Sequence, residues 1–185
     1  MKNKFIEEEI IYTGGQLSSN WIYKNFDILG DAIIAFCGPA EVKTEDLIDL
    51  QDFKQNLFIY SEKMLHFLVE HFDIDLEKAI YRQRLLICII FEELRSRANK
   101  GIKIERIGDD IFVNNKKLTV SIATNTLVST LIHAGINIIN EGTPIPTEGL
   151  NNLKIEIKEF ALKVLSRYGD EVEEINLARC KVAGR

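Results

Sequence analysis

The chain has 185 residues, 46% of them hydrophobic and 28% charged, with a formal net charge of −5. This length and balance predict one globular domain over residues 1–185, and the negative charge disfavours a general affinity for nucleic acid. The longest apolar run, Leu85–Phe91, is too short to cross a membrane, and the amino terminus lacks the apolar core of a signal peptide. From the absence of both signals we expect a cytoplasmic protein. The three cysteines lack metal-ligand spacing, and a reducing compartment would keep them as free thiols.

The amino-terminal part of the chain predicts two strands and a short helix. β-Branched and aromatic residues within Phe5–Tyr12 indicate an edge strand, which Gly14-Gly15 stops. A short amphipathic helix follows, and Gly30 ends it because glycine favours a left-handed backbone. Asp31–Cys37 then indicates a buried strand that Gly38-Pro39 breaks.

The central part of the chain predicts a surface crossing, strands and one long helix. The polar residues Glu41–Gln55 indicate the crossing, with a helical turn within it, and Leu57–Tyr60 is a strand candidate. The apolar pattern of Met64–Phe72 matches neither the helical nor the strand periodicity cleanly. Strand and helix both stay open, with strand favoured. Apolar residues recur at helical spacing over Asp75–Asn99 behind an aspartate cap, which predicts a long helix that Gly101 ends.

The last part of the chain predicts short strands followed by helices. The strands, joined by tight turns, are Ile102–Ile107, Ile111–Val113, Lys117–Ala123 and Ile132–Ile139. Gly142, Pro144 and Pro146 mark the loop that leaves the last strand. An apolar stripe over residues 153–165 indicates a helix, which Gly169 interrupts before a shorter amphipathic segment. Together these elements predict an α+β fold in which a mixed, largely antiparallel sheet carries helices on one face.

Three short motifs carry a family resemblance. Asp109-Asp110-Ile111 looks like an Asn-Asp-Ile/Leu motif, Lys117 like the lysine of a Lys-Leu-x-Gly-Ile segment, and Gly135-Ile136-Asn137 like a closing Gly-Ile-Asn. In this order the motifs resemble those of the biotin- and lipoate-protein ligase superfamily. The whole chain also resembles a small prokaryotic family of unknown function with the same fold. The resemblance implies a ligase-like fold and a small carboxylic acid or acyl group as ligand.

The resemblance makes Lys117 the candidate catalytic residue. In the ligases this ammonium offsets the negative charge that develops on the phosphate or acyl oxygen, and Asp110 would hold it in place. Lys116 and Lys117 could equally be a solvated pair beside a turn, and Asp110 a turn aspartate that bonds its own backbone. Gly135 would let the backbone approach a ligand closely, or would only relieve crowding in a strand.

Four further residues are candidate ligand contacts. Asn137 closes the last motif, and His133 resembles a histidine of the octanoyl transferases, although its spacing to Asn137 is one residue shorter. Those transferases also use a downstream cysteine, which this chain lacks between Asn137 and Leu165. Gln16 could line the mouth of the site, and Arg106 could supply positive charge.

The expected nucleotide loop is missing. Where the ligases hold ATP phosphates with glycine and arginine, this chain has Gly38-Pro39-Ala40-Glu41-Val42. Adenylation with ATP would therefore require Arg82, Arg84 or Arg106 from elsewhere in space. We carry two hypotheses: an enzyme, or degenerate enzyme, that binds a small carboxylic acid, and a non-catalytic binding or assembly module that has lost the loop.

Two weaker interpretations concern metal and self-association. His66, Glu70 and His71 could be read as a metal cluster, but no third ligand shares a face with His66 and Glu70 on a strand, and a structural role is favoured. The edge strand Phe5–Tyr12 could pair across a homodimer axis, although its glutamates equally protect a free edge.

Overall fold

The computed structural model describes residues 1–141 and 145–184. In chain order, the elements are β1 (Lys2–Phe5), α1 (Trp21–Phe26), β2 (Ala32–Val42), η1 (Thr44–Asp46), α2 (Leu50–Lys54), β3 (Ile59–His71), α3 (Leu76–Arg97), β4 (Ile104–Ile107), β5 (Asp110–Val113), β6 (Lys116–Lys117), β7 (Thr119–Asn125), β8 (Thr130–Asn137) and α4 (Ile157–Cys180). Within the described ranges they form a large sheet, in the order β1-β2-β3-β8-β7, and a small sheet, in the order β4-β5-β6. Only the β1–β2 pairing among these is parallel. The predicted α+β fold with a mixed, largely antiparallel sheet is confirmed.

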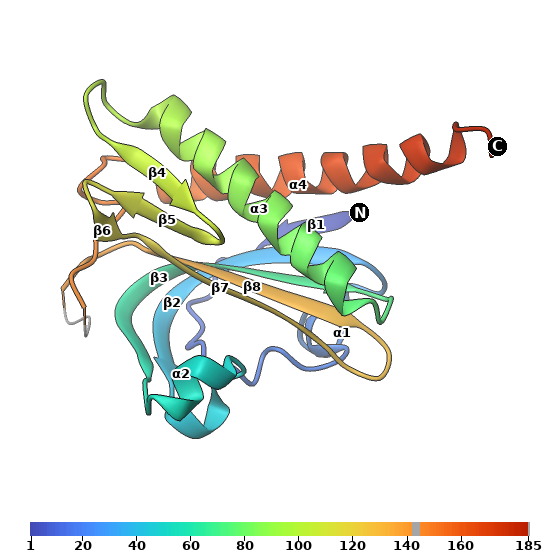
Figure 1. Cartoon of the computed structure of the whole chain (residues 1–185), viewed down its shortest axis with the longest axis horizontal. Helices are drawn as coiled ribbons and strands as arrows, with labels where there is room; N and C mark the ends of the chain where they lie inside the picture. The colour runs from blue at the N-terminus through green and yellow to red at the C-terminus, as the bar shows by residue number, and fades with distance from the viewer. Residues whose placement is uncertain (142–144, 185) are drawn as a thin grey trace.

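One face of the large sheet carries the main core. Figure 1 shows α3 and α4 on the same side of this sheet. Alternation along β3 and β8 points Leu65, Phe67, Ile132 and Ala134 towards these helices, where they are fully buried. The side chain of Asp75 caps α3 by accepting a hydrogen bond from the backbone N–H of Lys78. The predicted long helix is therefore present, and its apolar stripe covers the sheet.

The opposite face is divided between a small second core and an open cleft. Ile34 and Phe36 of β2 and Leu68 of β3 pack there with Tyr12 and Ile22. Further along the same face, beyond this core, β3, β8 and β7 present a mixture of polar and apolar residues, and these form the floor of the cleft. In Figure 1 the segment with α2 lies on this side. The alternation of side chains thus separates a helix-covered face from a face that can hold a ligand.

The amino-terminal strand differs from the prediction. The edge strand is β1, Lys2–Phe5, rather than Phe5–Tyr12. The chain beyond it still follows β2, because the backbone N–H of Ile10 donates to the carbonyl oxygen of Cys37 at 3.0 Å, and Tyr12 forms an isolated bridge with Ala40. Separate hydrogen bonds rather than a regular ladder hold this segment, so its strand-like composition overstated its regularity.

The expected break at Gly38-Pro39 is also wrong. Strand β2 runs through it, and the irregularity is a register shift between Gly38 and Ala40. A β-bulge accommodates the missing N–H of proline without ending the strand. A Cβ atom on Gly38 would lie 2.0 Å from the carbonyl oxygen of Ile10, so the close approach of the amino-terminal segment requires glycine there.

Four other predicted boundaries differ in the structure. The two candidate strands of the centre are one strand, β3, and the predicted strand at Lys117–Ala123 is divided between β6 and β7 of different sheets. Gly169 does not interrupt α4; its Cβ position lies 3.6 Å from the carbonyl oxygen of Met1, so it lets the amino terminus approach the helix. Helix α1 ends at Phe26, before Gly30. Gly142 and Pro144 lie outside the described residues.

The carboxyl-terminal end of α4 leaves the body of the protein. Val172 is the last buried residue of this helix, and residues 173–180 are all exposed. Figure 1 shows this end extending past the large sheet. No helix within residues 1–141 and 145–184 is both long and apolar enough to span a membrane.

Candidate functional site

Two adjoining cavities of about 260 Å³ each form the cleft on the open face of the large sheet. They share five lining residues, which are Leu47, Asp52, Ile59, Lys117 and Val120. We call the first the polar lobe; its wall includes Tyr12, Ser121, His133 and five aspartates, Asp46, Asp49, Asp52, Asp109 and Asp110. We call the second the apolar lobe; its wall includes Leu57, Phe58, Ile59, Met64, Asn137 and Ile145. A molecule that spans both lobes would meet very different surroundings at its two ends.

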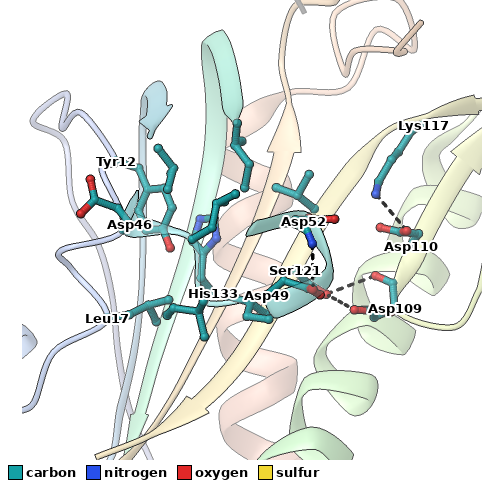
Figure 2. Close-up of a pocket in the computed structure, with 17 residues that line it drawn as sticks. Tyr12, Leu17, Asp46, Asp49, Asp52, Asp109, Asp110, Lys117, Ser121 and His133 are labelled. Carbon is teal, nitrogen blue, oxygen red and sulfur yellow. Dashed lines mark hydrogen bonds and ion pairs between the residues drawn. The ribbon is translucent and has the colours of Figure 1, made fainter. Parts of the chain in front are cut away.

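Lys117 reaches the cleft from the small sheet. Asn114 and Asn115 take positive φ angles of 50° and 66°, which asparagine tolerates, and this tight turn returns the chain from β5 into β6. Lys117 then lines both lobes, whereas Lys116 is exposed. The Nζ atom of Lys117 lies 2.9 Å from Oδ2 of Asp110, and each of these side chains is 28% exposed (Figure 2). Burial raises the pKa of the Asp110 carboxyl although the Lys117 ammonium opposes this shift.

The neighbouring aspartate connects the polar lobe to helix α3. Oδ1 of Asp109 lies 3.1 Å from the guanidinium of Arg84, and Oδ2 accepts hydrogen bonds from Gln83 at 3.0 Å and Ser121 at 3.2 Å. Arg84 is thus held at the edge of this lobe. The side chain of Arg82, which is 12% exposed, is paired with Asp73 instead, at 2.8 Å.

Two stacked rings form the far wall of the polar lobe. The rings of Tyr12 and His133 lie 3.7 Å apart between centroids and 9° from parallel. Nε2 of His133 lies 3.0 Å from Nδ1 of His66, whose Nε2 lies 3.1 Å from the carbonyl oxygen of Gly38. Burial lowers the pKa of His66 to about 4 and holds the pKa of His133 well below its usual value, so both rings are neutral near pH 7. Figure 2 shows Tyr12 and His133 on the opposite side of the lobe from Lys117 and Asp110.

The floor of the cleft comes from β8. Asn137 lines the apolar lobe, and its Oδ1 accepts a hydrogen bond from the Ser61 hydroxyl at 3.0 Å. Gly135 lies between His133 and Asn137 on the same face of the strand. A Cβ atom on Gly135 would lie 2.8 Å from Cε of Met64 and 3.2 Å from Cε1 of His133, so glycine leaves the space that these two side chains occupy.

Not every predicted site residue lies at the cleft. The structure brings Lys117, Asp110, His133 and Asn137 to its walls, whereas Gly135 lines neither lobe and lies beneath the side chains of Met64 and His133. Gln16 is placed elsewhere: its amide accepts from the backbone N–H of Thr13 and donates to the carbonyl oxygen of Ile11, so it holds the amino-terminal loop. Arg106 is exposed on β4 and donates to the carbonyl oxygen of Gly108.

The three residues considered for a metal site do not converge. Glu70 accepts hydrogen bonds from the backbone N–H of Asn20 at 2.7 Å and the Ser129 hydroxyl at 2.8 Å. His71 points to the helix-covered face, where it lies between Asp31 and Tyr168. Among the residues that the structure describes, no group of three or more potential ligands could hold a metal ion.

Sequence reasoning missed most of the polar lobe. Asp46, Asp49 and Asp52 recur every third residue, a spacing that places carboxylates together on short helical turns. The spacing is visible in the sequence, whereas the polar composition of the segment indicates only a surface crossing with a helical turn. Tyr12 and Ser121 gave no local signal, because only the pairing of distant strands brings them to the cavity.

Comparisons with known proteins place the chain in a family. Residues 1–183 match the model of a domain of unknown function, DUF366. An uncharacterized protein of Methanocaldococcus jannaschii is 39% identical over 178 residues, which cover 92% of this chain and 79% of that protein. A solved structure, a protein of unknown function from Pyrococcus horikoshi, is 34% identical with a TM-score of 0.92 and covers 100% of both chains.

More distant solved structures share the fold. The biotin protein ligase of Aquifex aeolicus in complex with biotin and ATP is 14% identical, with a TM-score of 0.59 over 92% of this chain and 71% of that chain. A T. acidophilum protein with bound lipoic acid is 14% identical, with a TM-score of 0.58 over 94% and 87%. At this identity the likeness shows the biotin- and lipoate-protein ligase fold alone. By sequence over almost its whole length, the chain belongs to the DUF366 family.

Proposed function

We propose that the protein binds a small carboxylic acid or acyl compound in the cleft, with its apolar chain in the apolar lobe and its carboxylate at Lys117. The observation that carries this proposal is the position of Lys117, the cationic side chain that lines both lobes. An ammonium beside an apolar cavity matches a ligand that has a hydrocarbon chain and one acidic end. The shared fold with proteins solved with biotin or lipoic acid supports this choice of ligand class.

Asp110 positions the ammonium for this role. Its ion pair with Lys117 holds the Nζ atom at the junction of the lobes, and the partial burial of both side chains reduces screening by water. A ligand carboxylate that arrives here would share the ammonium with Asp110. Ligand binding should then raise the pKa of Asp110 further, because a second negative charge would lie close to it.

A second candidate function is a binding module without nucleotide chemistry. The observation that favours it is the structure of residues 38–42, where the ligases of the resemblance hold ATP phosphates. In this chain these residues belong to strand β2, with Ala40, Glu41 and Val42 paired to β3 and Glu41 also bonded to Tyr12. Backbone N–H groups that are engaged in strand pairing are not available to a phosphate.

Calorimetric titration with octanoate tests the first proposal. Lys117→Ala should weaken binding by about 1.5–3 kcal/mol, the range for hydrogen bonds to a charged group. Lys116→Ala is the matched control, because the Lys116 side chain is exposed to solvent. The affinity of this variant for octanoate should equal that of the unaltered protein. Equal losses for the two variants would refute the assignment of Lys117. Release of pyrophosphate from ATP in the presence of octanoate would decide against the binding module.

A further inference from the structure

The polar lobe contains a lone pair whose position is fixed by a chain of hydrogen bonds. The carbonyl oxygen of Gly38 can only accept, so Nε2 of neutral His66 carries the hydrogen and Nδ1 carries a lone pair. That lone pair must accept the hydrogen bond from Nε2–H of His133 at 3.0 Å. His133 is therefore held in the tautomer that leaves its Nδ1 without a hydrogen.

Nδ1 of His133 faces the cavity without a protein partner. Within the described residues no group bonds to this atom, and every fully buried side-chain nitrogen or oxygen there does have a partner. The atom therefore opens into the polar lobe, which His133 lines. The Tyr12 hydroxyl likewise has no bonded partner among the described residues and opens into the polar lobe. Both Tyr12 and His133 are only 3% exposed. Two buried polar groups on one stacked pair thus lack the hydrogen bonds that such groups normally make.

The charges around the Tyr12–His133 wall define which ligand can bond to these two polar groups. Five aspartates line the polar lobe against one lysine, and among the described residues Asp46, Asp49 and Asp52 form no ion pair. An ionised carboxylate only accepts hydrogen bonds, as does the lone pair of His133. The lobe is therefore rich in acceptors and negative charge, and its occupant has to donate hydrogen bonds and carry positive charge.

We propose that the polar lobe binds a protonated amine, with Nδ1 of His133 accepting a hydrogen bond from the ammonium and the Tyr12 hydroxyl as its second contact. His66 is a positioning residue that fixes the tautomer of His133. The inference deepens the proposed function and rests on it for the other end of the ligand. Because Figure 2 places the Tyr12–His133 wall away from Lys117, a chain with a carboxylate at Lys117 and an amine at its other end would cross the polar lobe to this wall, whereas a ligand without the amine would place its chain in the apolar lobe.

Three matched probes separate the two sites. Octanoate has only the carboxylate, octylamine has only the ammonium, and 8-aminooctanoate has both. His133→Phe keeps an aromatic ring on Tyr12 but removes the acceptor, so it should weaken octylamine and 8-aminooctanoate binding about tenfold and leave octanoate unchanged. Lys117→Ala should weaken octanoate and 8-aminooctanoate and leave octylamine unchanged. Calorimetric titration at pH 7 measures all nine combinations of the unaltered protein and these variants.

Each outcome decides one of the two claims. If octanoate binds through Lys117 and octylamine does not bind, the amine site is refuted and the proposed function stands. If octylamine binds and His133→Phe weakens it while octanoate does not bind, the amine site stands and the proposed function fails. Should His133→Phe fail to fold, Tyr12→Phe decides, because unchanged octylamine affinity in that variant overturns the site. Binding by none of the probes overturns both.

Discussion

Acidification should destabilise the protein between about pH 6.5 and pH 4, because every histidine of the chain is buried in its neutral form. The chain has three histidines, and burial lowers the pKa of each of them in the folded state. In the unfolded chain each titrates near its ordinary value of about 6.5. Below that pH the unfolded chain binds more protons than the folded protein, so acid shifts the equilibrium towards unfolding.

The size of the effect follows from His66. Its contribution to stability is fully present above pH 6.5 and is lost as the pH falls towards its folded pKa of about 4. At about 1.4 kcal/mol per pH unit, this one group removes about 2 kcal/mol between pH 7 and pH 5 and about 3 kcal/mol in total. His71 and His133 act in the same direction. Asp110 acts in the opposite direction, because burial raises its pKa.

Urea unfolding at pH 7, 6 and 5 measures this slope. His66→Gln keeps an amide that can bond to the Gly38 carbonyl and to His133 but does not titrate, so its free energy of unfolding should fall less steeply over the same range. A free energy of unfolding that is constant or rises from pH 7 to pH 5 in the unaltered protein would refute the reasoning. Identical slopes in both proteins would refute the assignment to His66.

Two other substitutions test close contacts. Gly38→Ala should lower the free energy of unfolding by about 1–3 kcal/mol, the usual cost of overpacking, because the new Cβ would lie 2.0 Å from the Ile10 carbonyl oxygen. Gly15→Ala is its control, since that Cβ meets nothing closer than 3.5 Å, and equal urea midpoints would contradict the contact. Tyr168→Phe removes the hydroxyl 3.0 Å from Nε2 of His71 and should cost about 1–3 kcal/mol in urea unfolding. A cost near zero would mean that this nitrogen finds another donor.

The parts of the fold that depend on local signals were predictable. Helical spacing and an aspartate cap located α3, and the turn asparagines located the hairpin that presents Lys117. Gly38 shows why other parts were not. A glycine-proline pair ordinarily ends a strand, but here a neighbouring segment packs against it, and the contact between Gly38 and Ile10 joins residues far apart in sequence.

The candidate site was predictable to the same limited degree. Lys117 and Asp110 lie close in sequence, so one hairpin both predicts and builds their ion pair. The wall of the polar lobe needs Tyr12, His66 and His133, which three separate segments contribute. Whether a histidine nitrogen is free or bonded depends on the register of β2, β3 and β8, which no local pattern fixes.

The exposed carboxyl-terminal end of α4, residues 173–180, differs in local stability from the rest of this continuous helix. Up to Val172, unfolding a turn would expose core side chains, so opening there is coupled to disruption of the core. Unfolding a turn within residues 173–180 exposes no core side chain. An unsupported helical segment shorter than about 12 residues is also only marginally stable in water. Backbone amides of residues 173–180 should therefore exchange with solvent through fraying, while those of the preceding turns should stay protected until the core opens.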